Sequence, residues 1–481
     1  MTDWRVNPFW LPWLLLLWWT QSKSWLRRWI KYWLLRPLMR LGIQLADESE
    51  EKDATIFLES DGQQSSDSAL PGGLVNGGNL CFVNAVLQSL AAIPGFLNGL
   101  DRAVRTRSQL IRAPQTDDSQ TYKVLVVETL ISIMRDLSIN SHTEELKAKT
   151  EAKEDDGQRL TREDKQQKSR RFRVALSRCT SLVSSAASRQ EQQDAEEFLT
   201  FLLELLHEVL RVPAQSIRSN EDEHSRFLEL EKNLSLRLKC FNPNDPRSYV
   251  QAVENLGELR WDFFLRHNAS IITDLFSGQM VRGSQCCSCA NLTCLHEEQR
   301  VFSLPIATEN GEQTLAKCLE TFRQSEELTE DNRVFCDVYC QKKTPRMTQM
   351  LLQRVPPVLI IRLQRFRQLS WGGCTEKVDT PVTFPCGNDE LLDISMNTFC
   401  QEDTTSVNYE LVAVCAHLGH SIDSGHYIAY VRHRGPWRDA ASSEQWLRID
   451  DENVRVIETT KLRNETLTAA YLLFYSQVPL K

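Results

Sequence analysis

One cysteine lies where a nucleophile could be activated. The glycine-rich segment GLVNGGNL (residues 73–80) leads into Cys81, and the apolar run behind it predicts a helix over 82–93. The positive end of a helix dipole and its unpaired backbone N–H groups favour the thiolate form of a cysteine at that position. Asn76 could donate an amide hydrogen to an oxyanion. A cysteine that opens a helix is more often structural than catalytic. Cys81 therefore indicates catalysis only if a general base lies nearby.

Candidate bases lie near the other end of the chain. His417, His420 and His426 occur within 409–431, where two segments alternate between apolar and polar residues as β-strands do. His426 follows a glycine at the start of the second segment, where a strand could hold the imidazole beside a loop from another part of the fold. Spacing alone does not choose among the three, and a lone histidine is more often a packing or surface residue than a base.

Acidic residues near these segments are candidate partners. Asp450 and Asp451 close a further β-type segment, and a carboxylate there could accept the imidazole N–H and fix its tautomer. Without context, a solvated acidic turn is the favoured interpretation. Asp194 and Glu197 lie at the start of an amphipathic helix, where a capping-box-like role is a sufficient structural explanation.

Four of the fourteen cysteines have the spacing of metal ligands. Cys286 and Cys289 form a C-x-x-C pair, and Cys336 and Cys340 form a C-x-x-x-C pair further along. Four thiolates in two close pairs suit a tetrahedral, structural Zn²⁺ site. We expect no disulfide framework, because we find no secretory signal and expect this part of the chain to face the cytosol. Four reduced thiols without a metal are the alternative.

Together these segments resemble the ubiquitin-specific proteases, a papain-like family of deubiquitinating enzymes. The cysteine box of that family, G-L-x-N-x-G-N-T-C-x-x-N, matches residues 73–84 at every fixed position except Leu80, where threonine is usual. The histidine box, Y-x-L-x-A-V-x-x-H-x-G-(loop)-G-H-Y-x-A-Y, matches residues 409–430. Several boxes in the right order are far more specific than any one of them.

The resemblance assigns a role to the cysteine and to each histidine. It implies that Cys81 is the nucleophile and that His426 is the base. His417 corresponds to the second, non-catalytic histidine of the family, and His420 is expected to be a loop residue.

The resemblance also assigns roles to the acids. The family motif W-x-x-F-D-D-x-x-V is similar to residues 446–454 and implies that Asp450 completes a Cys-His-Asp triad. It implies that Asp451 contributes near the oxyanion, together with Asn76. The motif Q-Q-D-A-x-E-F matches the chain from Gln192 to Phe198 and implies that three residues face the basic tail of ubiquitin: Gln193, Asp194 and Glu197.

The resemblance covers about residues 72–478 and implies an α+β, papain-like cysteine protease fold. A helical thumb would carry the cysteine, a β palm the histidine and the triad acid, and β fingers at about 270–345 the four candidate zinc ligands. Many family members hold a structural zinc there, and catalysis needs no cofactor. A charge-dense stretch at about 141–171 is predicted to be a solvated insertion.

The first 44 residues differ in composition from the rest. They contain eight of the 12 tryptophans and seven Lys/Arg against one acid, although the whole chain has a net charge of −8. The uncharged run 6–22 with a basic flank favours a membrane-anchor helix over 1–44. An interfacial amphipathic helix, or a hydrophobic segment packed on the domain, is the alternative. Residues 45–71 are acidic and predict a flexible tether. The acidic remainder argues against nucleic acid as a partner.

These observations predict a membrane-anchored, thiol-dependent deubiquitinase that hydrolyses isopeptide bonds at the C-terminal glycine of ubiquitin. Short hydrophobicity with basic flanks is similar to signal anchors of the mitochondrial outer membrane. The anchor and the ending AYLLFY most resemble a member of the family found there, which has serine where this chain has Asp450. We therefore expect a monomer that removes ubiquitin from mitochondrial outer-membrane proteins, opposes mitophagy and faces the cytosol. A peroxisomal or endoplasmic-reticulum membrane is the alternative location.

Two other functions remain open on the sequence. One is a catalytically dead, membrane-tethered scaffold that binds ubiquitin. The other is a protease for another ubiquitin-like modifier. The intact Cys81, His426 and Asp450 argue against the scaffold.

Overall fold

The computed structural model of the 481-residue chain describes these residues: 72–106, 118–138, 162–183, 192–212, 220–239, 246–307, 311–368, 375–387, 389–399, 407–421, 424–432 and 445–478. The predicted anchor (1–44) and tether (45–71) lie outside the described residues, and so does 139–161, which covers most of the predicted charged insertion. The end of that insertion, 162–171, is not a loop but the first part of a helix.

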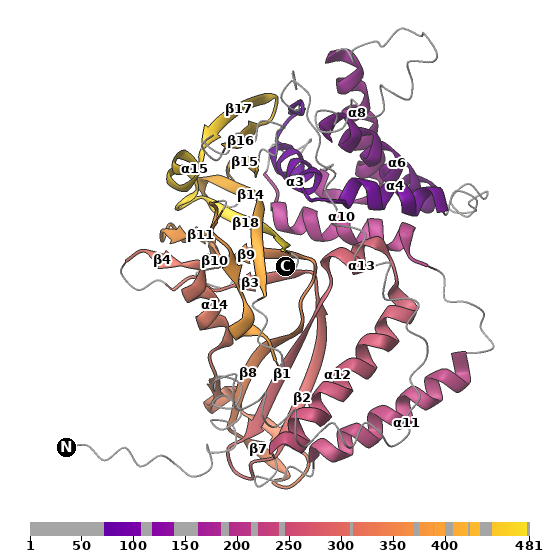
Figure 1. Cartoon of the computed structure of the whole chain (residues 1–481), viewed down its shortest axis with the longest axis vertical. Coiled ribbons are helices and arrows are strands. Elements are labelled where there is room, and N and C mark those ends of the chain that lie inside the picture. Colours follow the sequence, from indigo (N-terminus) through magenta and orange to yellow (C-terminus); the bar gives the residue numbers. More distant parts are fainter. Residues whose placement is uncertain are drawn as a thin grey trace.

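A group of helices forms the thumb, at the top of Figure 1. Its members are α3 (Cys81–Ala91), α4 (Phe96–Thr106), α6 (Asp118–Ser138), α8 (Arg162–Cys179), α10 (Ala195–Leu210) and α13 (Ile271–Phe276). Helix α3, expected over 82–93, is buried along residues 81–90. Phe82 of α3 and Phe198 of α10 pack edge to face, with ring centroids 5.6 Å apart. The helix that begins at Cys81 is therefore a core element of the thumb.

Within the described part of the chain, no single helix is long and apolar enough to cross a membrane. Helices α3 and α4 pass on length and composition only when taken together, with a bend of 89° between them, and α3 is buried inside the thumb. The anchor expected in 1–44 falls outside the residues to which this finding applies.

An eight-stranded sheet forms the palm, in the order β17-β16-β15-β14-β18-β9-β3, with β13 paired to β14. The strands are β3 (Val301–Leu304), β9 (Val358–Leu363), β13 (Leu392–Asp393), β14 (Asn408–Ser421), β15 (Ser424–Arg432), β16 (Gln445–Asp450), β17 (Asn453–Glu458) and β18 (Ala470–Gln477). Strands β15 and β16 are antiparallel, with Ala429 opposite Ile449. Because of this register, the start of β15 and the end of β16 lie at the same edge of the sheet.

The palm buries apolar side chains on both faces, because successive residues of a strand point to opposite sides. Ala413 and Cys415 of β14 pack in the cluster that contains the thumb helices, whereas Val414 and Ala416 pack in a second cluster on the other face. The sheet is therefore held against the thumb by one complete face.

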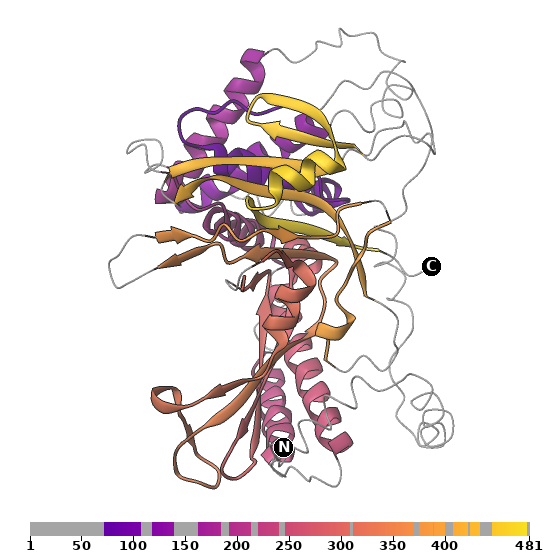
Figure 2. The ribbon, with the colours of Figure 1, turned by 90° about the vertical axis from the view of Figure 1, so that its left-hand side faces the viewer.

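A longer, narrower sheet forms the fingers, at the bottom of Figures 1 and 2. Its order is β2-β1-β8-β5, and its tip carries the hairpin β6–β7. The strands are β1 (Gly278–Cys286), β2 (Leu292–Gln299), β5 (Glu326–Leu328), β6 (Val334–Cys336), β7 (Lys342–Thr344) and β8 (Arg346–Arg354), and helices α11 (Asn220–Lys239) and α12 (Pro246–Asn268) lie alongside. Val253 and Leu256 of α12 pack against Val281 and Leu292 of the sheet. Because β8 ends at Arg354, the finger strands extend past the expected limit at about 345.

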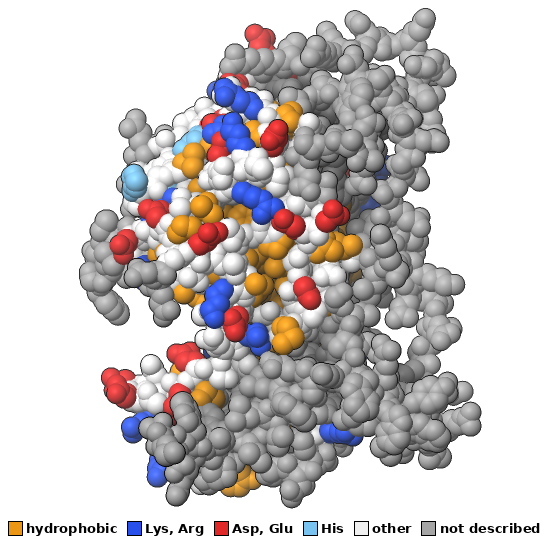
Figure 3. Space-filling view, turned by 60° about the vertical axis from the view of Figure 1, so that its left-hand side comes forward, with side chains coloured by type: hydrophobic (Ala, Val, Ile, Leu, Met, Phe, Trp, Pro, Cys, Tyr) orange, Lys and Arg blue, Asp and Glu red, His pale blue; other side chains and the backbone are white. Residues whose placement is uncertain are grey.

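The remaining described elements are short connections. They are β4 (Gln313–Thr314), α14 (Leu315–Arg323), β10 (Phe366–Gln368), β11 (Thr375–Lys377), β12 (Val382–Thr383), α15 (Thr459–Thr466) and two 3₁₀ turns, Glu330–Asn332 and Ser395–Asn397. Strand β4 pairs with β12, and β10 pairs with β11. On the face in Figure 3, acidic and basic side chains are interspersed among apolar ones, and the outline is indented above the projecting end of the fingers.

Candidate active site

Cys81 is the first residue of α3 and is only 3 % exposed. The loop before it is curled around Asn76, whose Oδ1 accepts hydrogen bonds of 3.1 Å from the backbone N–H groups of Gly78 and Leu80. Gly78 has φ +110°, which explains a glycine at that position. The cysteine is thus presented at a helix N-terminus by a loop with its own hydrogen bonds.

His426 lies near the start of β15 and faces both predicted partners. Its Nε2 is 2.7 Å from Oδ1 of Asp450. The hydrogen bond with Cys81 is the largest influence that raises the pKa of His426, to about 9, and Asp450 adds to it while burial opposes it. Because Nε2 is engaged by Asp450, Nδ1 is the ring nitrogen that is available to Cys81. The structure therefore brings Cys81, His426 and Asp450 together in the arrangement of a catalytic triad.

Asp450 ends β16 and accepts at both of its oxygens. Oδ1 meets His426, and Oδ2 accepts a hydrogen bond of 3.1 Å from Nη1 of Arg448. Burial alone would raise the pKa of Asp450, but the contacts with His426 and Arg448 outweigh it and lower the pKa below its ordinary value. Asp450 therefore stays ionised, which suits a group that orients an imidazole.

Asp451 connects the cysteine loop to the palm. Its Oδ2 accepts from Nδ2 of Asn76 at 3.0 Å, and its Oδ1 accepts from Nδ2 of Asn84 at 2.8 Å. Its backbone oxygen accepts from the N–H of Leu74 at 2.9 Å. A Cβ added to Gly73 would lie 2.3 Å from that oxygen, so the close approach requires glycine. Asp451 is thus a hydrogen-bond acceptor for Asn76. Its Oδ2 lies 3.9 Å from Nε2 of His426.

The other two histidines have different environments. His417 is fully buried, and burial lowers its pKa to about 4. The backbone of Gly425 packs closely against the His417 ring, because a Cβ added to Gly425 would lie 2.5 Å from Nε2 of His417. His417 therefore stays neutral and acts in packing, as the sequence suggested. His420 was expected in a loop but lies in the last part of β14, where it is exposed.

The predicted tail-binding residues differ in exposure. Asp194 is the N-cap of α10, accepts from the N–H of Glu196 at 2.8 Å, and receives the hydroxyl of Tyr471 at 2.8 Å. Burial raises the pKa of Asp194. Glu197 is exposed and Gln193 is half-buried. Of the two acids, only Glu197 is open to a solvent-side partner in this structure.

Four residues near the site were not predicted from the sequence. Gln192, rather than Gln193, approaches the nucleophile, with Nε2 at 3.5 Å from Sγ of Cys81. Lys377 donates to the backbone oxygens of His417 and Gly419 at 2.8 and 2.9 Å and so supports the strand that precedes His426. The other two are Asn84 and Arg448.

Sequence patterns could have found two of these four. Asn84 is a fixed position of the cysteine box, and Arg448 lies two residues before Asp450, on the same face of a strand. The roles of Gln192 and Lys377 depend on tertiary packing.

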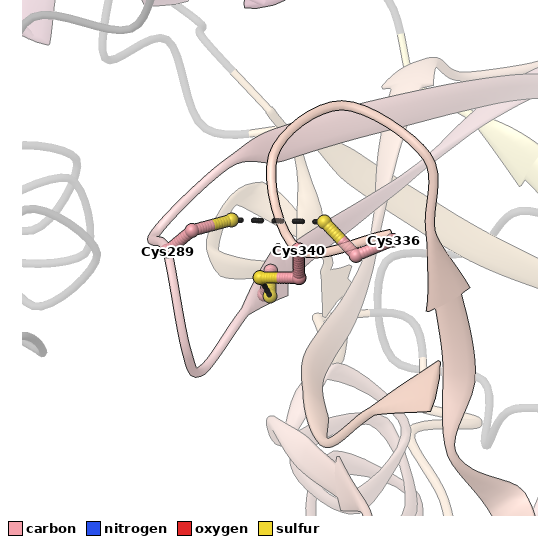
Figure 4. A group of neighbouring side chains, drawn as sticks. Cys289, Cys336 and Cys340 are labelled. Atoms are coloured by element: carbon pink, nitrogen blue, oxygen red, sulfur yellow. Dashed lines mark hydrogen bonds between the residues drawn. The ribbon is translucent and has the colours of Figure 1, made fainter. Parts of the chain in front are cut away.

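Two turns at the tip of the fingers bring four cysteines together (Figure 4). Sγ of Cys289 lies 3.6 Å from Sγ of Cys336, and Sγ of Cys286 lies 3.9 Å from Sγ of Cys340. All four sulfurs lie within 4.8 Å of one another. Tetrahedral Zn–S bonds of about 2.3 Å place two sulfurs about 3.8 Å apart. These side chains therefore fit a zinc ion, and the cluster could bind one.

The extra residue of the second pair is absorbed by its turn. The N–H of Ala290 bonds to the oxygen of Cys286, and the N–H of Gln341 bonds to the oxygen of Cys336, both at 2.9 Å. Ala290 and Gln341 both have positive φ, 58° and 50°. Each turn therefore closes in the same way behind its second cysteine, although one is a residue longer.

Comparisons with known proteins agree with this geometry. The sequence model of the family described as ubiquitin carboxyl-terminal hydrolase matches residues 72–475. The chain is 26% identical over 407 residues to ubiquitin carboxyl-terminal hydrolase Usp2 of Drosophila melanogaster, covering 84% of this chain and 34% of that protein. It is 30% identical over 286 residues to ubiquitin carboxyl-terminal hydrolase 2 of Homo sapiens, covering 59% of this chain and 40% of that protein. The chain thus matches less than half the length of these relatives.

The fold is similar to solved structures. A chain in the structure of the SAGA Ubp8/Sgf11/Sus1/Sgf73 DUB module bound to ubiquitin aldehyde matches with a TM-score of 0.54 and 20% identity, over 85% of this chain and 70% of that chain. A chain in the structure of the Ubp8-Sgf11-Sgf73-Sus1 SAGA DUB module matches with a TM-score of 0.52 and 20% identity, over 85% and 68%. At this identity the likeness concerns the fold alone, and it confirms the predicted mixed α and β catalytic fold.

Proposed function

The chain belongs to the ubiquitin carboxyl-terminal hydrolase family, and we propose that it is a cysteine-type ubiquitinyl hydrolase that cleaves isopeptide bonds at the C-terminal glycine of ubiquitin. The observation that carries the proposal is the meeting of Cys81 with the His426–Asp450 pair where the thumb packs on the palm. The chain order of the three residues is that of papain-like enzymes.

The proposed reaction proceeds through an acyl-enzyme. His426 takes the proton of Cys81, and the thiolate attacks the carbonyl carbon of the terminal glycine of ubiquitin. When the tetrahedral intermediate collapses, His426 gives that proton to the leaving lysine amine and a thioester remains. Water, losing a proton to His426, then attacks the thioester and releases the carboxylate. Asp450 keeps the imidazole oriented through both steps.

Asn76 is proposed to stabilise the oxyanion. One hydrogen of its Nδ2 is directed to Asp451, and an amide nitrogen carries a second hydrogen that can be donated to the intermediate. The backbone N–H of Cys81 adds a donor, because the first turn of a helix leaves its N–H groups without intrahelical partners. Asp451 accepts from the side-chain amides of Asn76 and Asn84, so it is proposed to contribute by holding them in place.

Ubiquitin is the proposed protein partner. We propose that ubiquitin contacts the surface where the outline is indented above the end of the fingers (Figure 3). Glu197 is proposed to meet the basic tail of ubiquitin directly, because it is exposed at the start of α10. Asp194 is proposed to act behind it by fixing the helix N-terminus through Tyr471. Gln193, half-buried beside them, completes the proposed tail-binding set.

Zinc is proposed as a structural ion at the tip of the fingers. Cys286, Cys289, Cys336 and Cys340 would hold it, and the ion would lock the β6–β7 hairpin to the end of β1. The cluster belongs to the fingers, away from the thumb–palm interface, so the ion takes no part in the reaction.

The proposed location is the mitochondrial outer membrane. The tryptophan-rich, basic residues 1–44 support it, together with their resemblance to the anchor of mitochondrial ubiquitin carboxyl-terminal hydrolase 30. There a monomeric enzyme would remove ubiquitin from membrane proteins and oppose mitophagy. Imaging residues 1–44 fused to a fluorescent reporter tests this, and a peroxisomal or endoplasmic-reticulum pattern would reject it.

Ubiquitin with an electrophile at its C-terminus tests the proposed activity. The active enzyme should form a covalent adduct at Cys81, identified by mass spectrometry of the digested product, and Cys81→Ala should form none. A scaffold without catalysis would bind ubiquitin without an adduct. A protease for another modifier would react with the corresponding electrophilic modifier and leave the ubiquitin derivative intact.

A further inference from the structure

A polar cleft is lined in part by the proposed triad acid. Its volume is about 350 Å³, and its lining consists of Arg448, Asp450, Asn453, Arg455, Lys461 and Glu465. Asp450 is therefore in contact with His426 on one side and with a solvent-accessible, charged cavity on the other. The mechanism described above uses none of the other lining residues.

Among the residues that line the cleft, Arg448 donates a hydrogen bond to Asp450, from Nη1 to Oδ2 at 3.1 Å. Its Nε lies 3.2 Å from Oε2 of Glu465 on α15. The hydroxyl of Tyr430 donates to the same oxygen at 2.7 Å. Arg448 and Tyr430 are directly opposite each other on β16 and β15. The guanidinium is thus held between two carboxylates, and a tyrosine fixes the second of them.

We propose that Arg448 is a positioning residue for catalysis, which orients the Asp450 carboxylate toward His426 and is itself held by Glu465. The proposal rests on the function proposed above. Arg448 touches neither the substrate nor the reacting sulfur; it acts through Asp450 alone.

Geometry supports this role for Arg448. A carboxylate that accepts only one hydrogen bond can rotate about its terminal torsion, which is broad for aspartate. A second bond from a planar guanidinium, itself held at another nitrogen, fixes the plane of that carboxylate. The lone pair of Oδ1 then stays directed at Nε2 of His426, and the imidazole keeps its other nitrogen toward Cys81.

Charge balance explains the role of Glu465. An isolated arginine beside Asp450 would cancel the negative charge that stabilises the imidazolium of His426. Glu465 offsets the charge of Arg448, at 3.2 Å, while Lys461 lies further away, at 3.8 Å from Glu465. Asp450, Arg448 and Glu465 alone sum to a net charge of −1, and Lys461, ion-paired with Glu465, brings the group of four to neutrality, so Glu465 keeps this group from becoming net positive.

The test compares steady-state cleavage of a ubiquitin–fluorophore conjugate by the wild-type chain and by variants of the cleft. Arg448→Ala is expected to lower kcat about 10- to 100-fold, the range that small misplacements of catalytic groups produce, with KM unchanged. Arg455→Ala, which removes the same charge from the same cleft without a bond to Asp450, should stay within twofold of wild type. Guanidinium at millimolar concentration should restore part of the kcat of Arg448→Ala, whereas sodium chloride should not.

Several outcomes would overturn the proposal. One is a kcat of Arg448→Ala within twofold of wild type, and another is a loss of kcat that guanidinium does not relieve while the melting temperature is unchanged. Arg448→Lys covers the case in which the alanine variant does not fold, because it keeps the charge but lacks the planar fork; it should lose kcat at a wild-type melting temperature, and wild-type kcat would reject the role. A wild-type chain that leaves the conjugate intact would instead reject the proposed function.

Discussion

The proposed catalytic centre and the cysteine cluster are assembled in opposite ways. The centre joins the start of α3 to the edge of the palm, so Cys81 and His426 come from distant parts of the chain. The cluster joins the turn between β1 and β2 to the turn of the separate β6–β7 hairpin. Hydrogen bonds hold the first site together, whereas the second consists of four sulfurs close enough to one another to bind a metal ion. Disturbing one site should therefore leave the other intact.

The hydrogen bonds of the catalytic centre cross from thumb to palm. Asp451 alone receives Asn76, Asn84 and the backbone of Leu74. At the cluster, each turn closes with its own backbone hydrogen bond, and one further bond of 3.0 Å, from the N–H of Cys287 to the oxygen of Pro345, joins the first turn to the end of the β6–β7 hairpin. Reactivity at the first site thus depends on the packing of the thumb on the palm, whereas we propose that stability at the second depends on a zinc ion.

The largest expected effect is that of Cys81→Ala. Removing the nucleophile should lower kcat for ubiquitin–fluorophore cleavage by about 10⁴-fold or more, because no other group can form the acyl-enzyme. Binding of ubiquitin, measured by calorimetry, should persist. Cys179→Ala is the matched control, since this partly buried thiol lies in α8 outside the site and should leave kcat unchanged. A Cys81→Ala variant that keeps its rate would mean that another residue is the nucleophile.

Cys336→Ser should have the next largest effect, and on stability rather than on chemistry. Loss of one of four ligands should remove bound zinc, measured by mass spectrometry of the native protein, and lower the free energy of unfolding by about 3 kcal/mol or more. Alkylation of Cys81 by iodoacetamide should proceed at the wild-type rate. Cys294→Ser, in strand β2 of the fingers but outside the group of four cysteines, should keep the metal. Metal retained by Cys336→Ser would remove this residue from the ligand set.

Local patterns in the sequence predicted much of both sites. The apolar run after Cys81 correctly predicted α3, and the glycine before His426 correctly marked the start of a strand. Spacing indicated the two cysteine pairs as a possible metal site, and the family resemblance implied that they meet in the fingers. These features depend on neighbours within a few residues, which is the range over which sequence periodicity carries information.

The contacts between thumb and palm could not be predicted in this way. The acceptor role of Asp451 depends on a turn in which this residue adopts φ 51°, uncommon for a non-glycine residue. The approach of Gln192 to Cys81 depends on how α10 packs on α3. Residues 162–171, the end of the predicted solvated insertion, form the first part of α8, which packs against α6, and most of their described side chains are exposed. Tertiary packing decided each of these features.

Asp450→Asn should have a smaller effect on activity than loss of the nucleophile. The amide keeps the shape of the side chain but removes its negative charge, so the imidazolium of His426 loses its partner and kcat should fall about 100-fold. Metal content and the unfolding free energy of the fingers should not change, which separates the two sites once more. Asp393→Asn, an exposed acid on β13, is a matched control that should have wild-type activity. Wild-type kcat in Asp450→Asn would reject this residue as the triad acid.

The smallest expected effect is on the pKa values of two histidines on neighbouring strands, and through them on how stability depends on pH. The pKa of His426 is raised to about 9, first by Cys81, whereas burial lowers the pKa of His417 to about 4. A raised pKa stabilises the folded state when the group is protonated. That contribution is complete below pH 6.5, the ordinary histidine value, and is lost as pH rises through about 9. His417 acts with the opposite sign: the unfolded chain gains its proton as pH falls from about 6.5 to 4, so the folded state loses stability in that range.

In Cys81→Ala the first cause of the raised pKa of His426 is gone. NMR titration of the imidazole should then place the pKa of His426 closer to 6.5, while the pKa of His417 stays unchanged. A pKa of His426 that remains near 9 in this variant would show that the palm alone sets it, and that the thumb does not complete the site.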